Sequence, residues 1–260
     1  MPRIEAQQPT PQAETFPVSF VVITHEADAP MMQGLLNTLP ANAEVCILTN
    51  RQTKDGEEPT LSEVEVKQVG TLTLRLQHWV YAGSFHFAEA RNLCDQLATN
   101  EWRMWIDTDD RLAHCQHELL RRFATTCPAG YGAAWCGVAS YEPSWDGMAQ
   151  GKITSAYQIR LYRGSIGARW EGRVHEQIYP HIQQLGFNAS ETSIIVIHTG
   201  YMGSVEQREA KLRRNFDLLT KQVVEGATTQ HLTNFFESAL QDTASALREL
   251  DIIKRNKRNG

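Results

Sequence analysis

The sequence lacks the features that would place the protein in or across a membrane. None of its apolar runs approaches the ~20 residues that a membrane-spanning helix needs. Residues 1–15 are polar, contain three prolines, and have no apolar core of the kind found in a signal peptide. We therefore expect a disordered lead-in over residues 1–16 and a cytoplasmic protein without a membrane span.

The sequence has only five cysteines, and its 25 basic residues are fewer than its 30 acidic ones. The five cysteines are odd in number and form no Cys-x-x-Cys pair, so reduced cytosolic thiols, partly buried in secondary structure, are the simplest interpretation. The formal net charge of −5 gives no general attraction to nucleic acid or to an anionic membrane. Local basic patches remain, and residues 254–258 form one.

The composition is that of an ordinary globular protein. At 260 residues, with 42% hydrophobic and 21% charged residues, the chain suits one large α/β domain with a small appendage. Residues 17–24 are apolar and β-branched, which predicts a central strand covered on both faces. A predicted helix over residues 31–39 and a predicted strand over 45–49 follow. This spacing indicates a right-handed crossover within a parallel sheet.

Further elements are predicted along the chain. Residues 64–69 alternate like a strand with one exposed face, and residues 131–141 and 193–197 are apolar strands. After residue 205 two apolar stripes at helical spacing predict an antiparallel helix pair. We expect this pair to pack on the larger domain or on a second copy of the chain, as a homodimer.

The most informative stretch is an apolar run that leads directly into three acids. Residues 102–106 are followed by Asp107, Asp109 and Asp110, with a threonine between the first two acids. A strand that ends in carboxylates places them at the carboxyl edge of a sheet, where open α/β folds bind ligands. Clustered acids repel one another unless a cation neutralises them, and hard oxygen ligands suit Mg²⁺ or Mn²⁺. The alternative is a solvated turn in which Asp109 or Asp110 caps the helix that begins near His114.

Three further motifs surround this run. They read Phe87-Ala88-Glu89-Ala90-Arg91-Asn92, Trp170-Glu171-Gly172-Arg173-Val174-His175-Glu176 and Ile197-His198-Thr199-Gly200-Tyr201. In this order and spacing the set resembles glycosyltransferase family 2, and within it the members with a C-terminal helical, tetratricopeptide-like extension. The resemblance covers roughly residues 17–223. It implies the GT-A fold: a Rossmann-like, mostly parallel sheet flanked by helices over residues 17–204, with a helical hairpin and basic tail over 205–260.

The resemblance also implies a nucleotide-sugar donor, with a UDP-sugar favoured. Family members hold the nucleotide at the ends of the first two strands, and the second strand here departs from their pattern, with Asn50 in place of an acid and a serine-rich turn. Arg91 has the alternative of an ordinary ion pair. The donor-binding residues that the resemblance implies are Thr24, His25, Glu26, Asn50, Arg91, Asn92 and Asp107.

A divalent cation and a general base complete the implied site. Asp109 and His198 match the metal ligands, Mn²⁺ or Mg²⁺ being the expected ion, and Asp110 is expected beside them. Glu176 matches the catalytic base, and Glu171 is the competing candidate. The alternative for either glutamate is a surface ion pair with a neighbouring arginine, which would be Arg160, Arg163, Arg169 or Arg173.

These residues predict a metal-dependent, inverting glycosyltransferase. Two other classes remain open: a nucleotidyltransferase or phosphohydrolase that uses the same acids, and a binding module that keeps the fold without catalysis. The acceptor is left open among a saccharide, a protein and a modified DNA base. A DNA acceptor would need a basic surface near the site.

Overall fold

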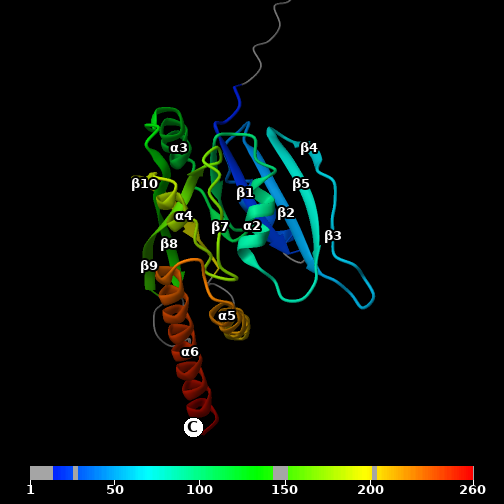
Figure 1. Ribbon diagram of the computed structural model, residues 1–260, viewed down its shortest axis with the longest axis vertical. Helices are drawn as coiled ribbons and strands as arrows, with labels where there is room; N and C mark the ends of the chain where they lie inside the picture. Colours follow the sequence, from blue (N-terminus) through cyan, green and yellow to red (C-terminus); the bar gives the residue numbers. More distant parts are fainter. Residues whose placement is uncertain (1–13, 26–28, 143–151, 201–203, 260) are drawn as a thin grey trace, which may run out of the picture.

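Ten strands form one sheet, and helices cover both of its faces, in the computed structural model of the protein (Figure 1). The structure describes residues 14–25, 29–142, 152–200 and 204–259. Its elements in chain order are β1 (Val18–His25), α1 (Ala29–Leu36), β2 (Glu44–Gln52), β3 (Thr60–Leu61), β4 (Glu65–Val69), β5 (Leu72–Tyr81), α2 (Phe87–Asp95), β6 (Trp102–Trp105), β7 (Asp110–Arg111), α3 (Cys115–Thr126), β8 (Tyr131–Glu142), β9 (Lys152–Arg163), α4 (Tyr179–Gln184), β10 (Asn188–His198), α5 (Val205–Glu225) and α6 (Gln230–Asn259).

The sheet has the order β3-β5-β2-β1-β6-β9-β8-β10-β7, and β4 pairs with β5 outside this path. Strands β5, β2, β1 and β6 are parallel, whereas β9 runs antiparallel to both of its neighbours. His25 lies opposite Asn50 in the β1–β2 register, and Val21 lies opposite Trp105 in the β1–β6 register. The carboxyl ends of these strands therefore share one edge. The predicted α/β fold class is confirmed, with a parallel central sheet and added antiparallel strands.

β1 is buried on both faces, which explains its continuous apolar sequence. Phe20 and Val22 belong to a core that includes residues of α1 and α3. Val21 and Ile23 point to the opposite face and pack with residues of α2 such as Cys94. Each layer of helices thus takes alternate residues of the same strand.

The C-terminal helices form the predicted antiparallel pair, and they pack on the sheet domain. Leu219 of α5 and Phe236 of α6 are fully buried, and their cluster includes Val174 from the segment before α4. Arg173 joins the same contact, since its backbone N–H donates to Gln222 Oε1 at 2.7 Å. In Figure 1, α5 lies beyond the carboxyl ends of the central strands, and α6 extends away from the sheet.

Two sequence-based expectations differ from the structure. β4 was expected to bury one face, yet all five of its residues are exposed, because it pairs only with β5 among the described strands and no helix packs on it. The alternative in which an aspartate caps the helix after the acid run is wrong, since α3 has His114 at its N-cap and no side-chain capping hydrogen bond.

The bounds of α1 and the first residue of the core also differ slightly from the predicted ones. α1 covers Ala29–Leu36 rather than residues 31–39, and a turn closed by the Leu39 N–H and the Leu36 carbonyl follows it. Phe16, expected in the lead-in, is buried in the core beside β1. All five cysteines are free thiols. Among the described residues, no helix combines the length and apolar character needed to cross a membrane.

Candidate functional site

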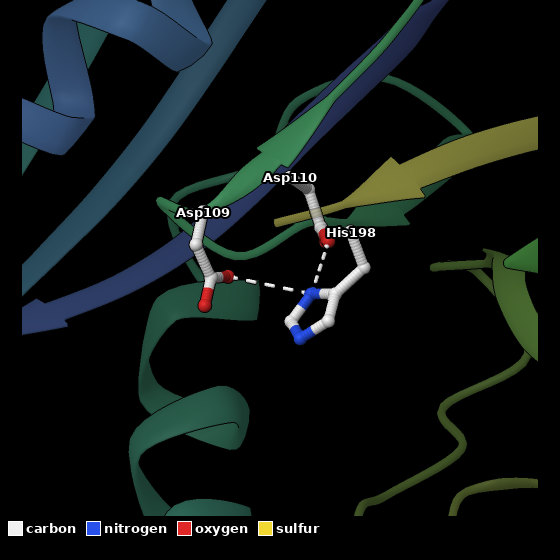
Figure 2. Close-up of side chains that lie close together, drawn as sticks. All are labelled: Asp109, Asp110 and His198. Atoms are coloured by element: carbon white, nitrogen blue, oxygen red, sulfur yellow. Dashed lines mark hydrogen bonds and ion pairs between the residues drawn. The ribbon is translucent and has the colours of Figure 1, made fainter. Parts of the chain in front are cut away.

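Asp110 lies at the centre of a fully satisfied polar network. β7 and β10 are antiparallel, with His198 opposite Asp110 in their register. Asp110 Oδ1 lies 2.8 Å from His198 Nδ1 (Figure 2), and the side chain of Asp110 is fully buried. Its other oxygen, Oδ2, accepts hydrogen bonds from Arg160 Nη1 at 2.7 Å and from the backbone N–H of Asp107 at 2.9 Å. Both carboxylate oxygens are therefore committed within the protein.

Asp109 is less completely satisfied. Its Oδ1 atom is buried and has no hydrogen-bond partner among the described residues, although it lies 3.5 Å from His198 Nδ1 (Figure 2). Gly200 leaves room on the other side of the pair. A Cβ atom at Gly200 would overlap Asp109 Oδ2 and would lie 2.7 Å from His198 Nε2. The absence of a side chain at Gly200 therefore keeps open the space where Asp109 Oδ2 and His198 Nε2 converge.

This arrangement fits a divalent cation. Asp109, Asp110 and His198 each offer a ligand atom within 4.8 Å of the others. Because Asp110 is hydrogen-bonded to His198 Nδ1, Nε2 of the same ring is the nitrogen that lies beside Gly200. A carboxylate that holds the far nitrogen of a metal-binding histidine is a common arrangement. Asp109 and His198 would hold the ion, and Asp110 would orient the imidazole.

The three side chains shift one another's proton affinity. Burial raises the pKa of Asp109, and the nearby charge of Asp107 raises it further. Burial opposes ionisation of Asp110 too, but the charge of Arg160 and the bond with His198 prevail and lower its pKa. Burial alone would lower the pKa of His198, but the hydrogen bond with Asp110 and the charge of Asp109 raise it above 6.5. A cation that binds here therefore competes with a proton on His198.

Arg91 connects the acid run to the predicted base. Its Nε donates to Glu176 Oε1, and its Nη2 lies 3.3 Å from Asp107 Oδ1. The Arg91 side chain is 3% exposed and that of Glu176 is 9% exposed, so this is a buried ion pair. Burial opposes the charge on Arg91, but the charges of Glu176 and Asp107 outweigh burial and hold the pKa of Arg91 above its ordinary value.

Trp105 lies between the two buried arginines of the site. The guanidinium carbon of Arg160 is 3.6 Å from the centroid of the Trp105 ring, and that of Arg91 is 4.1 Å from it. A guanidinium at this distance from an aromatic ring is attracted by its π electrons. Arg160 was predicted only as a possible partner of Glu171 or Glu176, and Trp105 was not predicted as part of the site. The available signal was an arginine between two apolar residues, Ile159 and Leu161, of a predicted strand.

The donor-binding residues predicted from the first two strands lie at the expected edge. Asn50 is buried, and its side-chain amide donates to the backbone carbonyl of Thr24 at 2.7 Å. This bond joins the carboxyl ends of β1 and β2. His25, the last residue of β1, is exposed there. Glu26, the third residue predicted at this edge, lies outside the described residues.

Asn92, predicted to bind the donor, contacts the backbone of Trp170. Its side chain accepts a hydrogen bond from the backbone N–H of Trp170 at 2.9 Å and donates to the carbonyl of the same residue at 3.0 Å. Both of its polar groups therefore fix the Trp170 segment against α2. Asn92 also lines a cavity of about 790 Å³ between α2 and the turn that joins α5 to α6. Neither the acids 107–110 nor His198 lines that cavity.

The two candidate bases are held in different places. Glu171 Oε1 accepts a hydrogen bond from the backbone N–H of Thr228 at 2.6 Å, and Oε2 accepts from its hydroxyl. Glu171 thus anchors the start of α6, whereas Glu176 contacts Arg91. The alternative, in which either glutamate forms a surface ion pair with a neighbouring arginine, has no support among the ion pairs of the described residues, where Glu176 pairs with the buried Arg91. Arg160, Arg163 and Arg173 pair with Asp110, Glu101 and Glu225.

Comparison with known proteins adds a relationship of sequence. No family model matches the chain. It is 26% identical over 132 residues to the SPbeta prophage-derived glycosyltransferase SunS of Bacillus subtilis strain 168, and equally to glycosyltransferase SunS of Bacillus phage SPbeta. The matched region is 51% of this chain and 29% of each relative, so the chain matches less than a third of their length.

Two solved structures also superpose on the chain, loosely. The mannosyltransferase PcManGT from Pyrobaculum calidifontis, in complex with GDP-Man and Mn²⁺, is 13% identical, with a TM-score of 0.47 over 98% of this chain and 79% of that one. S. aureus TarS 1–349 in complex with UDP-GlcNAc is 11% identical, with a TM-score of 0.45 over 87% of this chain and 71% of that one.

Proposed function

We propose that the protein is a metal-dependent, inverting glycosyltransferase that uses a nucleoside-diphosphate sugar. The observation that carries the proposal is the grouping of Asp109, Asp110 and His198 beyond the carboxyl end of β6. Asp107, in the same run of acids, is linked through Arg91 to the carboxylate of Glu176. The similarity to SunS, which is named a glycosyltransferase, supports it. Residues 17–204 would form the catalytic domain and residues 205–260 a helical hairpin with a basic tail.

The donor would bind along the carboxyl edge of β2, β1 and β6. Thr24 and Asn50 lie where a base or ribose would rest, and Asp107 lies beside Arg91, where the ribose would follow. A UDP-sugar is the favoured donor, and UDP-GlcNAc and GDP-Man are the donors in the two solved structures described above. A divalent cation held by Asp109 and His198 would neutralise charge on the leaving diphosphate.

Glu176 would remove the proton from the acceptor. Its carboxylate takes the proton of an acceptor hydroxyl while that oxygen bonds to the anomeric carbon and the bond to the diphosphate breaks. Attack from the face opposite the leaving group inverts the configuration. Arg91 would act as a positioning residue, because its guanidinium fixes the direction of the Glu176 carboxylate. Glu171 is committed to Thr228, which favours Glu176 for this role.

The acceptor and the assembly state belong to the same proposal. A saccharide, a protein side chain and a modified DNA base each offer a nucleophile that Glu176 can deprotonate. A homodimer through the C-terminal helices would cover exposed apolar residues there, of which Val224 is 83% and Ile252 is 56% exposed.

Product analysis tests the proposed reaction. The protein is incubated with Mn²⁺, a panel of nucleotide sugars chosen by thermal shift, and candidate acceptors. Sugar transfer is expected to release nucleoside diphosphate only when an acceptor is present, and the product should have the anomeric configuration opposite to that of the donor. Release of monophosphate or pyrophosphate would indicate a phosphohydrolase or nucleotidyltransferase. Donor binding without any release would indicate a binding module.

A further inference from the structure

A cavity of about 790 Å³ lies where the sheet domain meets the C-terminal helix pair. Its walls are α2, the segment 169–172 and the turn that joins α5 to α6. Small-molecule sites commonly occupy cavities of about 300–1,000 Å³ and are often found where two units of a protein meet. Neither His198 nor Glu176 lines this cavity, and the acids 107–110 do not line it either. The cavity is therefore separate from the proposed metal and base residues.

Hydrogen bonds between the walls fix the shape of the cavity. Asn92 binds both backbone groups of Trp170, which joins α2 to the segment 169–172. Glu171 Oε1 accepts from the backbone N–H of Thr228 at 2.6 Å, which joins the same segment to the turn before α6. These bonds hold the walls in place before any ligand binds. A ligand that enters the cavity would therefore need little further ordering of the protein.

The charges of the lining disfavour an anionic ligand. Three carboxylates line the cavity, those of Glu89, Glu171 and Glu225, against the guanidinium of Arg169. Arg173 does not line it but neutralises Glu225, with Nη2 at 2.6 Å from Oε1. The balance is slightly negative, so a phosphate, a nucleotide or an acidic peptide would be repelled, and Arg169 opposes a cation. The cavity suits a neutral ligand.

The lining mixes hydrogen-bond donors and acceptors. His181 Nδ1 accepts from the backbone N–H of Arg169 at 3.0 Å, and His86 Nδ1 accepts from that of Glu89 at 3.3 Å. Burial lowers the pKa of His86, which favours its neutral ring. A ring nitrogen that accepts carries no proton, so in a neutral ring Nε2 is the donor. Gln96 adds an amide that both donates and accepts. Hydroxyl groups, which also do both, match this mixture.

A smaller cavity of about 180 Å³ continues the first. The linings of the two share Arg169, Glu171, His181 and Thr228, and the smaller one extends along α4 to Gln184. Together they form an elongated space, larger than one amino acid or one monosaccharide would fill. Among the described residues, none of β1–β10 lines either cavity. The space therefore offers no strand edge to which an extended peptide could add.

We propose that these joined cavities bind a neutral oligosaccharide, which is elongated and rich in hydroxyl groups. Glu89, Gln96 and Arg169 would form hydrogen bonds with its hydroxyl groups, and the apolar side chains of Leu93 and Ala227 would contact its C–H faces. The inference goes beyond the proposed function, because binding here requires neither a nucleotide nor a metal ion.

The cavity adjoins the segment that carries Glu176. Gly172 lines it, and a Cβ at Gly172 would lie 3.3 Å from the Cα of Glu176. A saccharide bound in the cavity would therefore be held beside the backbone of the proposed base. Where the acceptor is itself a saccharide, a second contact of this kind raises its effective concentration at the site.

Ligand-observed NMR with neutral trisaccharides tests the inference. The full chain, without nucleotide or Mn²⁺, is titrated with chitotriose, maltotriose and mannotriose, and with neutral tetrapeptides for comparison. We expect at least one trisaccharide to bind with millimolar affinity or better. Glu89→Ala and Arg169→Ala should each weaken that binding roughly tenfold, because a hydrogen bond to a charged group is lost. Gln96→Trp, which places an indole in the cavity, should abolish it.

Glu118→Ala and Arg122→Ala are the matched controls. Both residues are exposed on α3 and line neither cavity, so these variants remove the same charges and should bind the trisaccharide like the wild-type protein. The three cavity variants should stay folded, because Glu89, Gln96 and Arg169 are exposed, and their melting temperatures check this.

Two results would overturn the inference and leave the proposed function standing. One is the absence of binding by any of the trisaccharides, and the other is trisaccharide binding that survives in Gln96→Trp. Binding of the tetrapeptides alone, lost in Gln96→Trp, would assign the cavity to a peptide and would overturn the inference as well.

Discussion

His198 Nδ1 lies 2.8 Å from Asp110 Oδ1, and this contact fixes the imidazole with Nε2 toward the space beside Gly200. The carboxylate that fixes the ring is itself fully buried and receives hydrogen bonds from Arg160 and the backbone. The orientation of His198 is thus set by the protein before any ion binds. Such preorganisation lowers the cost of assembling a metal site.

The metal assignment predicts that Gly200→Ala will weaken Mn²⁺ binding although every ligand is retained. The added Cβ would overlap Asp109 Oδ2 and lie 2.7 Å from His198 Nε2, where the ion would sit. We expect at least a tenfold loss of Mn²⁺ affinity by calorimetry, roughly that of disturbing a ligand's surroundings. Asp109→Asn should abolish the metal-dependent part of diphosphate binding while the protein stays folded.

Gly137→Ala is the matched control for this substitution. A Cβ at Gly137 would lie 3.5 Å from the side chain of Ile195, an ordinary contact distance, and no atom of Asp109 or His198 lies within 4 Å of it. It should bind Mn²⁺ like the wild-type protein. If the wild-type protein bound the diphosphate equally well in Mn²⁺ and in chelator, the assignment of a metal to this site would be wrong.

The assignment of the base predicts a large loss of turnover in Glu176→Gln. A general base contributes roughly 10²–10⁴-fold, and a carboxamide cannot take the proton. Because Glu176 pairs with the buried Arg91, the substitution should also destabilise the protein. Turnover must therefore be measured below the melting temperature of the variant. Glu171→Gln, which disturbs the contact with Thr228, should keep much more activity. If Glu171→Gln lost its turnover while Glu176→Gln retained it, the assignment of the base to Glu176 would be wrong.

The buried carboxyl group of Asp95, which is not one of the proposed site residues, should make the free energy of unfolding depend on pH. Burial raises the pKa of Asp95 to about 6, against the lowering effect of the hydrogen bond from Tyr162, whereas its ordinary value is 3.8. The folded protein therefore holds this proton more tightly than the unfolded chain does. The contribution of Asp95 to the free energy of unfolding is largest below pH 3.8 and falls as pH rises to about 6.

Chemical denaturation of Asp95→Asn at pH 4 and pH 7 measures this effect. Between these pH values the variant should gain up to about 3 kcal/mol relative to the wild-type protein, because two pKa units correspond to roughly that free energy. Asp55→Asn, an exposed residue in a turn, should follow the wild-type curve at both values. A constant difference between Asp95→Asn and wild-type protein would contradict the prediction.

Substitution of Gly172 tests how firmly the C-terminal helix pair is attached to the sheet domain. Its φ of 111° disfavours other residues, and a Cβ there would lie 2.6 Å from the Phe236 ring of α6. We expect Gly172→Ala to lose about 1–3 kcal/mol of stability through backbone strain, and more through displacement of Phe236. Gly167→Ala, with a φ of 70° and no neighbouring atom within 4 Å, isolates the strain alone. Equal melting temperatures of the two variants would show that Phe236 adjusts freely.

Local patterns predicted what depends on neighbours in sequence. The strand that leads to Asp107 and the apolar stripes of the helix pair follow from spacing within a few residues, and the structure has both. The approach of His198 to Asp109 is of another kind. These residues are 89 positions apart, and only the resemblance to a family suggested that they meet.

The partner of Arg160 could not be predicted from the sequence. Its contact with Asp110 depends on β9 lying between β6 and β8, and on β10 returning beside β8 to meet β7. Hydrophobic periodicity identifies strands but does not fix their order. The exposure of β4 has a similar cause, because alternation shows that one face is apolar and does not show whether a helix covers it.

The stacking of Arg91 and Arg160 on Trp105 restricts how such a protein can change. Both guanidinium groups lie over the Trp105 ring. Arg91 pairs with Glu176, the proposed base, and Arg160 pairs with Asp110, which contacts the imidazole of the histidine. A smaller side chain at position 105 would release both cations in a single step. Redesign of the acceptor side, in nature or in the laboratory, must therefore keep this ring or exchange both arginine–acid pairs together. Single substitutions that adjust one pair in isolation will be rare among active variants.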